Sequence, residues 1–187
     1  MNDICHRYFY ALQPSPAKLE AIAAHRDAFP GGYSHVSDER IHLTVAVTHD
    51  FDKHDERIVQ VLKAIGNRAA VDPFRVTLDR ISGSSNPDDK NRGSIALRAS
   101  RKPAGLSDLN LQLSAPMGHW GLLRDGWSLH PHTTLLYWQG QPFLRPIQPI
   151  SWLAIELVLI HSIVGETEHI ECGRWRLESD QHSLRFG

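Results

Sequence analysis

Two short stretches place a histidine two residues before a threonine, each inside an apolar run that favours a β-strand. "IHLTVAV" and "LHPHTTLLYW" carry the pairs His42 with Thr44 and His132 with Thr134, ninety residues apart. Side chains two apart in a strand share one face and lie about 7 Å apart. An imidazole can take or give a proton near neutral pH, and a hydroxyl can donate a hydrogen bond to a phosphoryl oxygen. Two such pairs on opposite sides of a phosphodiester would supply acid, base and hydroxyl groups without a metal.

A metal site is the alternative for the second stretch, because His130 stands two residues before His132. Two histidines on one strand face can bind zinc, but a zinc site needs at least a third protein ligand. The sequence has no His-x-x-x-His or matching carboxylate pattern to provide it. We therefore expect no metal and interpret His130 as a surface or supporting residue.

Composition bounds the class of protein and its ligand. The 187 residues are 41% hydrophobic and 22% charged, which is typical of a globular chain, and we expect one bilobal domain over residues 1–187 with a polar tail at 178–187. The formal net charge is −1, which argues against a surface for long nucleic acids, since those need clustered Lys and Arg. A small anionic ligand remains possible.

The expected location is the cytoplasm. The N-terminus "MNDICHRYFYALQ" has no apolar core of a signal peptide, and the most apolar run, Trp152–Ile160, is too short to span a bilayer. Cys5 and Cys172 form no Cys-x-x-Cys pair, so we expect two thiols in a reducing compartment.

Strands and helices are expected to alternate irregularly along the chain. The patterns predict helices near residues 17–29, 56–70 and 104–115, the last interrupted near Pro116 and Gly118. They predict strands at 7–12, 41–47, 74–81, 95–100, 132–138, 153–164 and 169–177, a loop at 82–94, and breaks at Pro142, Pro146 and Pro149. The order lacks the regular rhythm of a parallel sheet and predicts an α+β fold, with mostly antiparallel sheets in two packed lobes.

The ordered set of motifs resembles the two-histidine (2H) phosphoesterase superfamily, in particular its 2′-5′ RNA ligase and RNA 2′,3′-cyclic phosphodiesterase members. The resemblance rests on "HRYFYAL", "VSDERIHLTVAV", "LHPHTTLLY" and "IELVLIHSIVGETEHIECGRWRL" and covers most of the chain. It implies two lobes related by pseudo-twofold symmetry around a central cleft. It also implies that His42 is the proton donor and His132 the acceptor, with Thr44 and Thr134 on the phosphate.

Two positions depart from the pattern of the family. Many relatives carry an arginine five residues after the second histidine, where this chain has Tyr137, and an aromatic residue five after the first, where it has Val47. Both positions are associated with the base end of the ligand. We expect Tyr137 and His35 to be candidate ligand contacts, and Trp138, which shares strand parity with His132, to be structural.

The resemblance implies an enzyme that opens 2′,3′-cyclic phosphates at RNA or nucleotide ends. The expected product is a 2′-phosphate, and the reverse reaction would be 2′-5′ RNA ligation. We expect no cofactor and no membrane partner. Two alternatives stay open: a non-catalytic module that binds nucleotides or RNA ends, and a metal-dependent hydrolase that uses His130 and His132.

Overall fold

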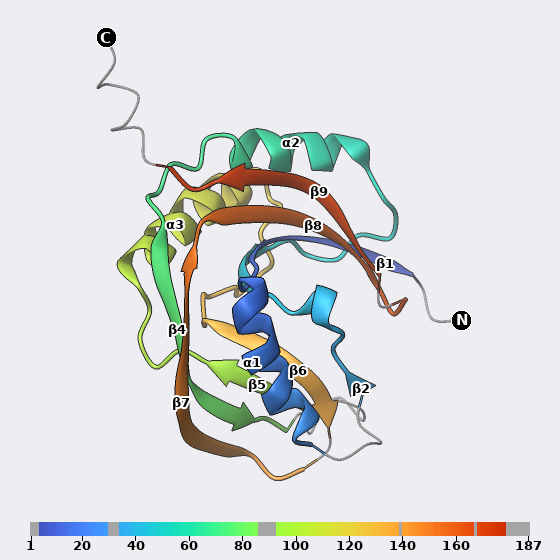
Figure 1. The fold of residues 1–187 in the computed structure, drawn as a ribbon. Coiled ribbons are helices and arrows are strands. Elements are labelled where there is room, and N and C mark those ends of the chain that lie inside the picture. Colours follow the sequence, from blue (N-terminus) through green and yellow to red (C-terminus); the bar gives the residue numbers. More distant parts are fainter. Residues whose placement is uncertain (1–3, 30–33, 86–92, 139, 167, 179–187) are drawn as a thin grey trace.

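The strands of the protein form two antiparallel sheets in a computed structural model that describes residues 4–29, 34–85, 93–138, 140–166 and 168–178 (Figure 1). In order across the sheet, the first consists of β3 (Leu43–Val47), β1 (Cys5–Leu12), β8 (Glu156–Val164) and β9 (Glu168–Arg176). The second consists of β2 (Ser34–His35), β6 (His132–Trp138), β5 (Gly93–Arg98), β4 (Phe74–Gly83) and β7 (Phe143–Ala154). Most of the loop expected at 82–94 and of the tail expected at 178–187 lies outside the described residues.

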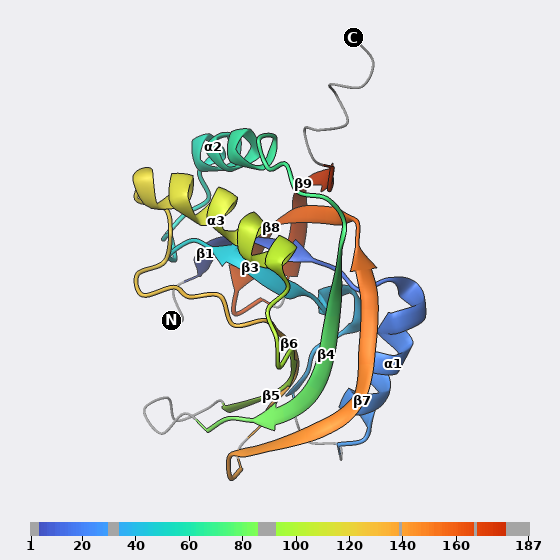
Figure 2. The same cartoon turned by 90° about the vertical axis from the view of Figure 1, so that its left-hand side faces the viewer.

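Three α-helices cover the outer faces of the sheets in the described part of the chain (Figure 2). α1 (Pro16–Asp27) packs on the second sheet, against β6 and β7. α2 (Glu56–Gly66) and α3 (Ala104–His119) pack on the first sheet and on each other. The α2 helix begins where the Asp55 carboxylate accepts a hydrogen bond from the Arg57 amide, an N-cap that satisfies one of the first-turn donors.

The hydrophobic core lies between the helices and the outer faces of the two sheets. The stripe of α2 formed by Val59, Leu62 and Ile65 is buried there, as its helical spacing predicts. A second, smaller apolar cluster lies on the inner face of the first sheet, with Trp127 packed against it; its members are Phe9, Ala11, Val47, Val158 and Ile160. This inner face carries His42, as shown below.

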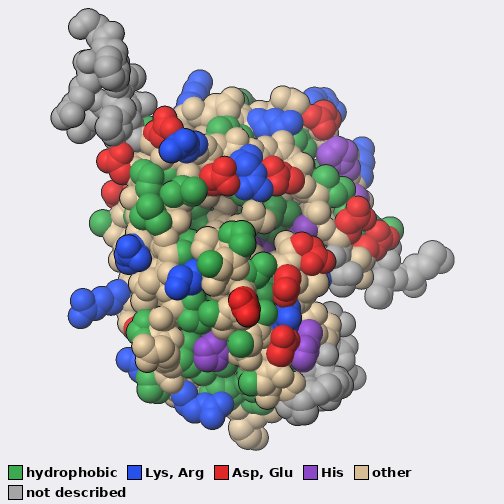
Figure 3. Space-filling model, in the orientation of Figure 1, with side chains coloured by type: hydrophobic (Ala, Val, Ile, Leu, Met, Phe, Trp, Pro, Cys, Tyr) green, Lys and Arg blue, Asp and Glu red, His purple; other side chains and the backbone are tan. Residues whose placement is uncertain are grey.

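The predicted fold class is confirmed: the chain is α+β, and every pairing between its described strands is antiparallel. No helix in the described ranges is long and apolar enough to cross a membrane. Acidic and basic side chains are interspersed on the face shown in Figure 3, which agrees with the near-neutral net charge.

The segment rich in proline differs from its prediction, which was wrong. The sequence patterns predicted breaks at Pro146 and Pro149 and one strand over 153–164, whereas β7 runs through both prolines and a separate β8 follows Ile155. β7 is at the edge of its sheet and pairs only with β4. A proline is tolerated on an edge strand because its missing N–H can face away from the ladder.

Three smaller differences concern the ends of two helices and one short strand. α3 continues through Pro116 to His119, since Leu113 and Met117 bury its last turns in the core. α2 ends at Gly66, four residues before the predicted end, and the two-residue strand β2 was not predicted.

Candidate active site

His42 lies between the short 3-10 helix η1 (Asp38–Arg40) and β3, on the inner side of the first sheet. Its Nδ1 is 2.7 Å from the carbonyl oxygen of Arg40, and a carbonyl oxygen only accepts, so Nδ1 carries the hydrogen. Nε2 is then the nitrogen left for exchanging protons with a ligand. The imidazole stacks on the ring of Phe9, with 4.7 Å between ring centroids.

His132 is held by the same kind of contact at the start of β6 in the second sheet. Its Nδ1 donates to the carbonyl oxygen of His130, at 2.6 Å, so its Nε2 is also the nitrogen left for chemistry. In each motif the histidine is thus fixed by a carbonyl two residues earlier in the chain. The structure places the two motifs equivalently, one in each sheet.

The electrostatics of the two histidines indicate that they lie close together. The pKa of His42 is lowered to about 4, mainly by burial; the hydrogen bond to the Arg40 carbonyl opposes this shift, and the nearby charges of His132 and Arg40 add to it. Burial also lowers the pKa of His132, and the positive charge of Arg98 lowers it as well. The strands that carry the motifs, β3 and β6, contact each other across the two sheets. Because the pKa values of His42 and His132 both lie below the ordinary value of 6.5, both imidazoles are neutral at pH 7 in the ligand-free protein.

An irregular pairing places Thr44 and Val47 on one face of the first sheet. Tyr10 pairs with Ala46, but the next residue of β1, Ala11, pairs with Thr44, so Val45 is an extra residue. Directly paired residues share a face, which puts Thr44 and Val47 on the side of Ala11 and Phe9. Regular alternation from His42 and Thr44 would place Ala46 on their face, but Ala46 pairs with Tyr10 and lies on the opposite face.

The same irregularity occurs in the second motif. Ala96 pairs with Thr134 and Ile95 with Leu136, so Leu135 is the extra residue and Tyr137, opposite Ser94, returns to the face of Thr134. Trp138 moves to the other face, where its Nε1 donates to the carbonyl of Ser84 and its ring packs on Phe143. Its predicted parity with His132 is thus wrong, although its packing is structural as expected.

His35 and His130 are the two candidates that the structure does not bring into the pair. His35 is exposed on β2 and pairs with Leu136, so it faces the side of α1, where its charge acts on Asp27. His130 is exposed, and its Nε2 contacts the Ser128 hydroxyl at 2.9 Å. Within the described ranges, no group of three or more His, Cys, Asp or Glu side chains is arranged to hold a metal ion.

Two residues near His42, His169 and Arg40, were not predicted from the sequence as part of the site. The His169 ring on β9 meets the His42 ring edge-on, with 5.5 Å between centroids, and it also contacts Phe9. Burial, then the charges of His42 and Arg40, lower the pKa of His169 to about 4. Arg40 precedes His42 by two residues, and its charge acts on both histidines. The only signals in the sequence were a histidine in a predicted strand and a cation next to the motif.

A pocket of about 560 Å³ lies elsewhere, between the end of α2 and the end of β9, and it contains neither motif histidine. Its lining includes Arg68, Arg174 and Trp175, but Arg174 is already bound to Glu156 and Glu171. The histidine pair is therefore the better candidate for chemistry.

Comparison with known proteins places this geometry in a family. The sequence profile of the 2′-5′ RNA ligase superfamily matches residues 13–163. E. coli LigT, crystallised with 3′-AMP, is similar at 23% identity with a TM-score of 0.75, over 92% of this chain and 98% of its own. A protein of Thermus thermophilus is similar at 19% identity with a TM-score of 0.73, over 93% of this chain and 99% of its own. No curated protein sequence matches the chain.

Two antiparallel sheets that each carry one His-x-Thr pair are the arrangement that the resemblance to the two-histidine phosphoesterases implied. The match over most of the chain shows that this protein belongs to the 2′-5′ RNA ligase superfamily.

Proposed function

We propose that the protein opens 2′,3′-cyclic phosphates at the ends of RNA or nucleotides, leaving a 2′-phosphate. The observation that carries this proposal is the matched pair of hydrogen bonds from Nδ1, which leaves Nε2 of both His42 and His132 for proton transfer. Hydrolysis of a cyclic phosphodiester needs one group to take a proton from water and another to give one to the departing oxygen. Two neighbouring imidazoles can do both.

In the proposed reaction, Nε2 of His132 takes a proton from water as the water oxygen attacks phosphorus. The bond from phosphorus to the 3′-oxygen breaks, and Nε2–H of His42 protonates that oxygen, giving a 2′-phosphomonoester and a 3′-hydroxyl. Thr44 and Thr134 donate to the two non-bridging phosphoryl oxygens, where negative charge grows. The same sequence of steps, with the 5′-hydroxyl of a second RNA end attacking phosphorus in place of water, breaks the bond to the 3′-oxygen and joins the ends by a 2′-5′ bond.

The solved structures of relatives support a nucleotide as the ligand. E. coli LigT has been crystallised with 3′-AMP, with ATP and with NADP⁺. For this chain we propose that Tyr137 and Val47 face the nucleoside, because the irregular pairings put both on the faces of Thr134 and Thr44. We also propose that residues 1–187 act as one bilobal domain, in the reducing cytoplasm, without a metal.

The direct test is incubation of the purified protein with a short RNA that ends in a 2′,3′-cyclic phosphate, in excess EDTA. We expect ring opening and a 2′-phosphate, identified by ³¹P NMR. Tight binding without turnover would favour the non-catalytic module. Turnover that disappears in EDTA would favour the metal-dependent alternative with His130 and His132.

A further inference from the structure

Unsatisfied buried nitrogens gather at the inner face of the first sheet. Among the described residues, five buried side-chain atoms have no hydrogen-bond partner, and two of them flank His42: Nε of Arg40 and Nδ1 of His169. A third, Nε1 of Trp127, belongs to the side chain that packs on the inner cluster with Phe9. Buried polar groups are almost always hydrogen-bonded, so such a concentration indicates a missing ligand or ordered solvent.

Arg40 differs in this respect from the other arginines around the site. Arg98, whose charge acts on His132, donates from Nε to the Ser82 hydroxyl at 2.7 Å. Arg7, on β1 two residues before Phe9, donates to both oxygens of Asp50 at 2.6 and 2.7 Å. The Arg40 side chain forms no ion pair with a carboxylate in the described ranges. A guanidinium in that situation, beside two neutral imidazoles, favours an anion.

We take this anion to be additional to the reacting phosphoryl group. In the proposed reaction the two non-bridging oxygens of that group are already bound by Thr44 and Thr134. The His169 ring meets the His42 ring edge-on, and the charge of Arg40 acts on both rings, so these two side chains lie on the side of His42. His42 protonates the ribose oxygen, so the ribose and whatever it carries next lie on this side. On an RNA end, the next anionic group along the chain is the phosphate on the 5′-oxygen of the terminal nucleoside.

We propose that Arg40 and His169 form a second phosphate subsite, so that the enzyme prefers cyclic phosphates that also carry a 5′-phosphate. This inference rests on the proposed function for the identity of the substrate. It names the substrate class as an RNA end or a 5′-phosphorylated nucleotide, and not a nucleoside 2′,3′-cyclic phosphate with a 5′-hydroxyl. Hydrogen bonds to a charged group contribute about 1.5–3 kcal/mol, which corresponds to a preference of at least about tenfold.

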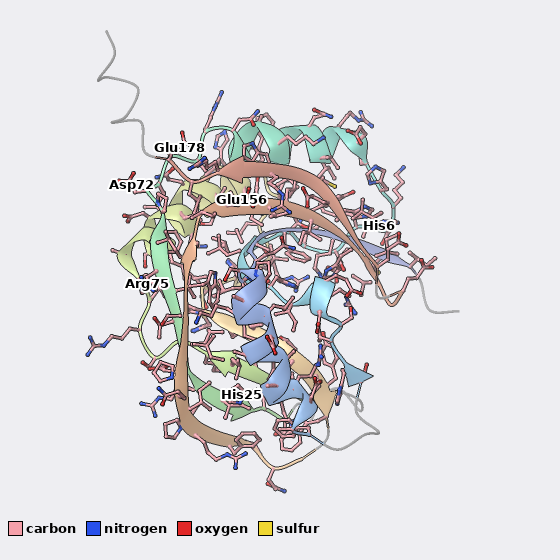
Figure 4. The ribbon with its side chains drawn as sticks, in the orientation of Figure 1. His6, His25, Asp72, Arg75, Glu156 and Glu178 are labelled. Carbon is pink, nitrogen blue, oxygen red and sulfur yellow. The ribbon has the colours of Figure 1, made fainter. Side chains whose placement is uncertain are left out.

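The test compares kcat/KM for adenosine 2′,3′-cyclic phosphate with and without a 5′-phosphate. We expect the wild type to prefer the 5′-phosphorylated substrate at least tenfold. Arg40→Gln should lose most of that preference, and His169→Phe should reduce it several-fold. The matched control is Arg75→Gln, which removes an exposed arginine (labelled in Figure 4) that pairs with Leu153 of β7 and lies on neither motif strand, and it should keep the preference.

A binding measurement separates this inference from the proposed function. By calorimetry, adenosine 2′,5′-bisphosphate should bind the wild type at least tenfold more tightly than adenosine 2′-phosphate, and Arg40→Gln should remove the difference. If the protein hydrolyses neither substrate but binds in this way, the proposed function fails and the subsite stands. Equal kcat/KM values and equal affinities in the wild type would overturn the subsite, as would an equal loss on both substrates in a folded Arg40→Gln protein. Thermal unfolding establishes that each variant is folded, and the wild-type comparison holds without any variant.

Discussion

Thr134 and Tyr137 face the same side of β6, although they are three positions apart and regular alternation would place them on opposite faces. Leu135 is an extra residue in the pairing with β5, and each residue of β6 after it therefore faces the side opposite to the one that regular alternation predicts. Val45 has the same effect between Thr44 and Val47 in the other sheet. The fifth position after each histidine therefore returns to the face of the chemistry, which gives a physical reason why it can contact a ligand.

The first prediction separates Tyr137 from its neighbour. Tyr137→Ala should raise KM for a cyclic nucleotide several-fold, because Tyr137 faces the site, and should lower the free energy of unfolding less than Trp138→Ala, although its half-buried ring also packs on the main core. Trp138→Ala should instead lower the free energy of unfolding by about 2–4 kcal/mol, since its ring packs on Phe143 and its Nε1 bonds to Ser84. Steady-state kinetics and urea unfolding of both variants check this. If Trp138→Ala raised KM and Tyr137→Ala mainly lowered stability, the side chains of β6 would alternate regularly and Trp138 would face the site.

The second prediction concerns the two histidines. His42→Ala and His132→Ala should each lower kcat by about 10²–10⁴-fold on a cyclic phosphate, the usual contribution of general acid or base catalysis. The control is His25→Ala, which removes a half-buried histidine on α1 (Figure 4) and should keep the rate. Near-full activity of either motif variant, with circular dichroism showing a native fold, would remove that histidine from the mechanism.

The third prediction concerns the threonines. Thr44→Val and Thr134→Val keep the shape of the side chain and remove the hydroxyl that donates to the phosphoryl group. Each should lower kcat/KM by about 10–100-fold, less than loss of a proton-transfer histidine, because one hydrogen bond to charge is lost. Thr77→Val on β4 removes a hydroxyl that bonds to Ser151 and is the matched control. A loss below about threefold at both motif positions would make these threonines ordinary strand residues.

The fourth prediction is that acid destabilises the fold between about pH 6.5 and pH 4. Burial holds the pKa values of His42 and His169 at about 4, whereas an imidazole in the unfolded chain titrates near 6.5. Between these values the unfolded chain binds more protons, so stability falls as the pH falls. Burial and the charges of His54 and His6 lower the pKa of His161 as well, and its Nε2 lies 2.8 Å from Nδ1 of His6, at the outer end of β1 in Figure 4.

Urea unfolding at half-unit steps of pH measures this effect. Each buried histidine contributes up to about 1.4 kcal/mol per pH unit, so His169→Phe should flatten the profile. His119→Gln, which replaces an exposed histidine at the end of α3, should not. A wild-type stability that does not change between pH 6.5 and pH 4.5 would contradict the burial of these imidazoles.

The sequence was sufficient for the fold class, the presence of the α2 helix and the strands that carry both motifs. It was insufficient wherever local preference competes with tertiary position. The prolines of β7 signal a break, and only the edge position of that strand makes them tolerable. The extra residues Val45 and Leu135 lie inside uniform apolar runs, where the sequence carries no mark of a changed parity.

The site shows the same division. One short motif occurs twice in the sequence, and this repetition indicates four residues of the site: His42, Thr44, His132 and Thr134. His169 belongs to no repeated motif and reaches His42 only because β9 pairs beside β8 and its side chain turns to the inner face. Whether a side chain ends up without a partner, as the Nε of Arg40 does among the described residues, depends on the whole fold and has no signature in the sequence.

The most direct test of the central claim is kcat/KM from pH 4 to pH 9 on a 2′,3′-cyclic nucleotide, with and without EDTA. Turnover requires one proton on the histidine pair, so the profile should be a bell whose limbs are the pKa values of the pair in the free enzyme. Because burial lowers the pKa of both His42 and His132, we predict a maximum below pH 6.5, unchanged by EDTA. The profile of kcat should lie at higher pH, since a bound anion stabilises the protonated imidazole. A single limb that rises toward alkaline pH and disappears in EDTA would contradict the two-histidine mechanism.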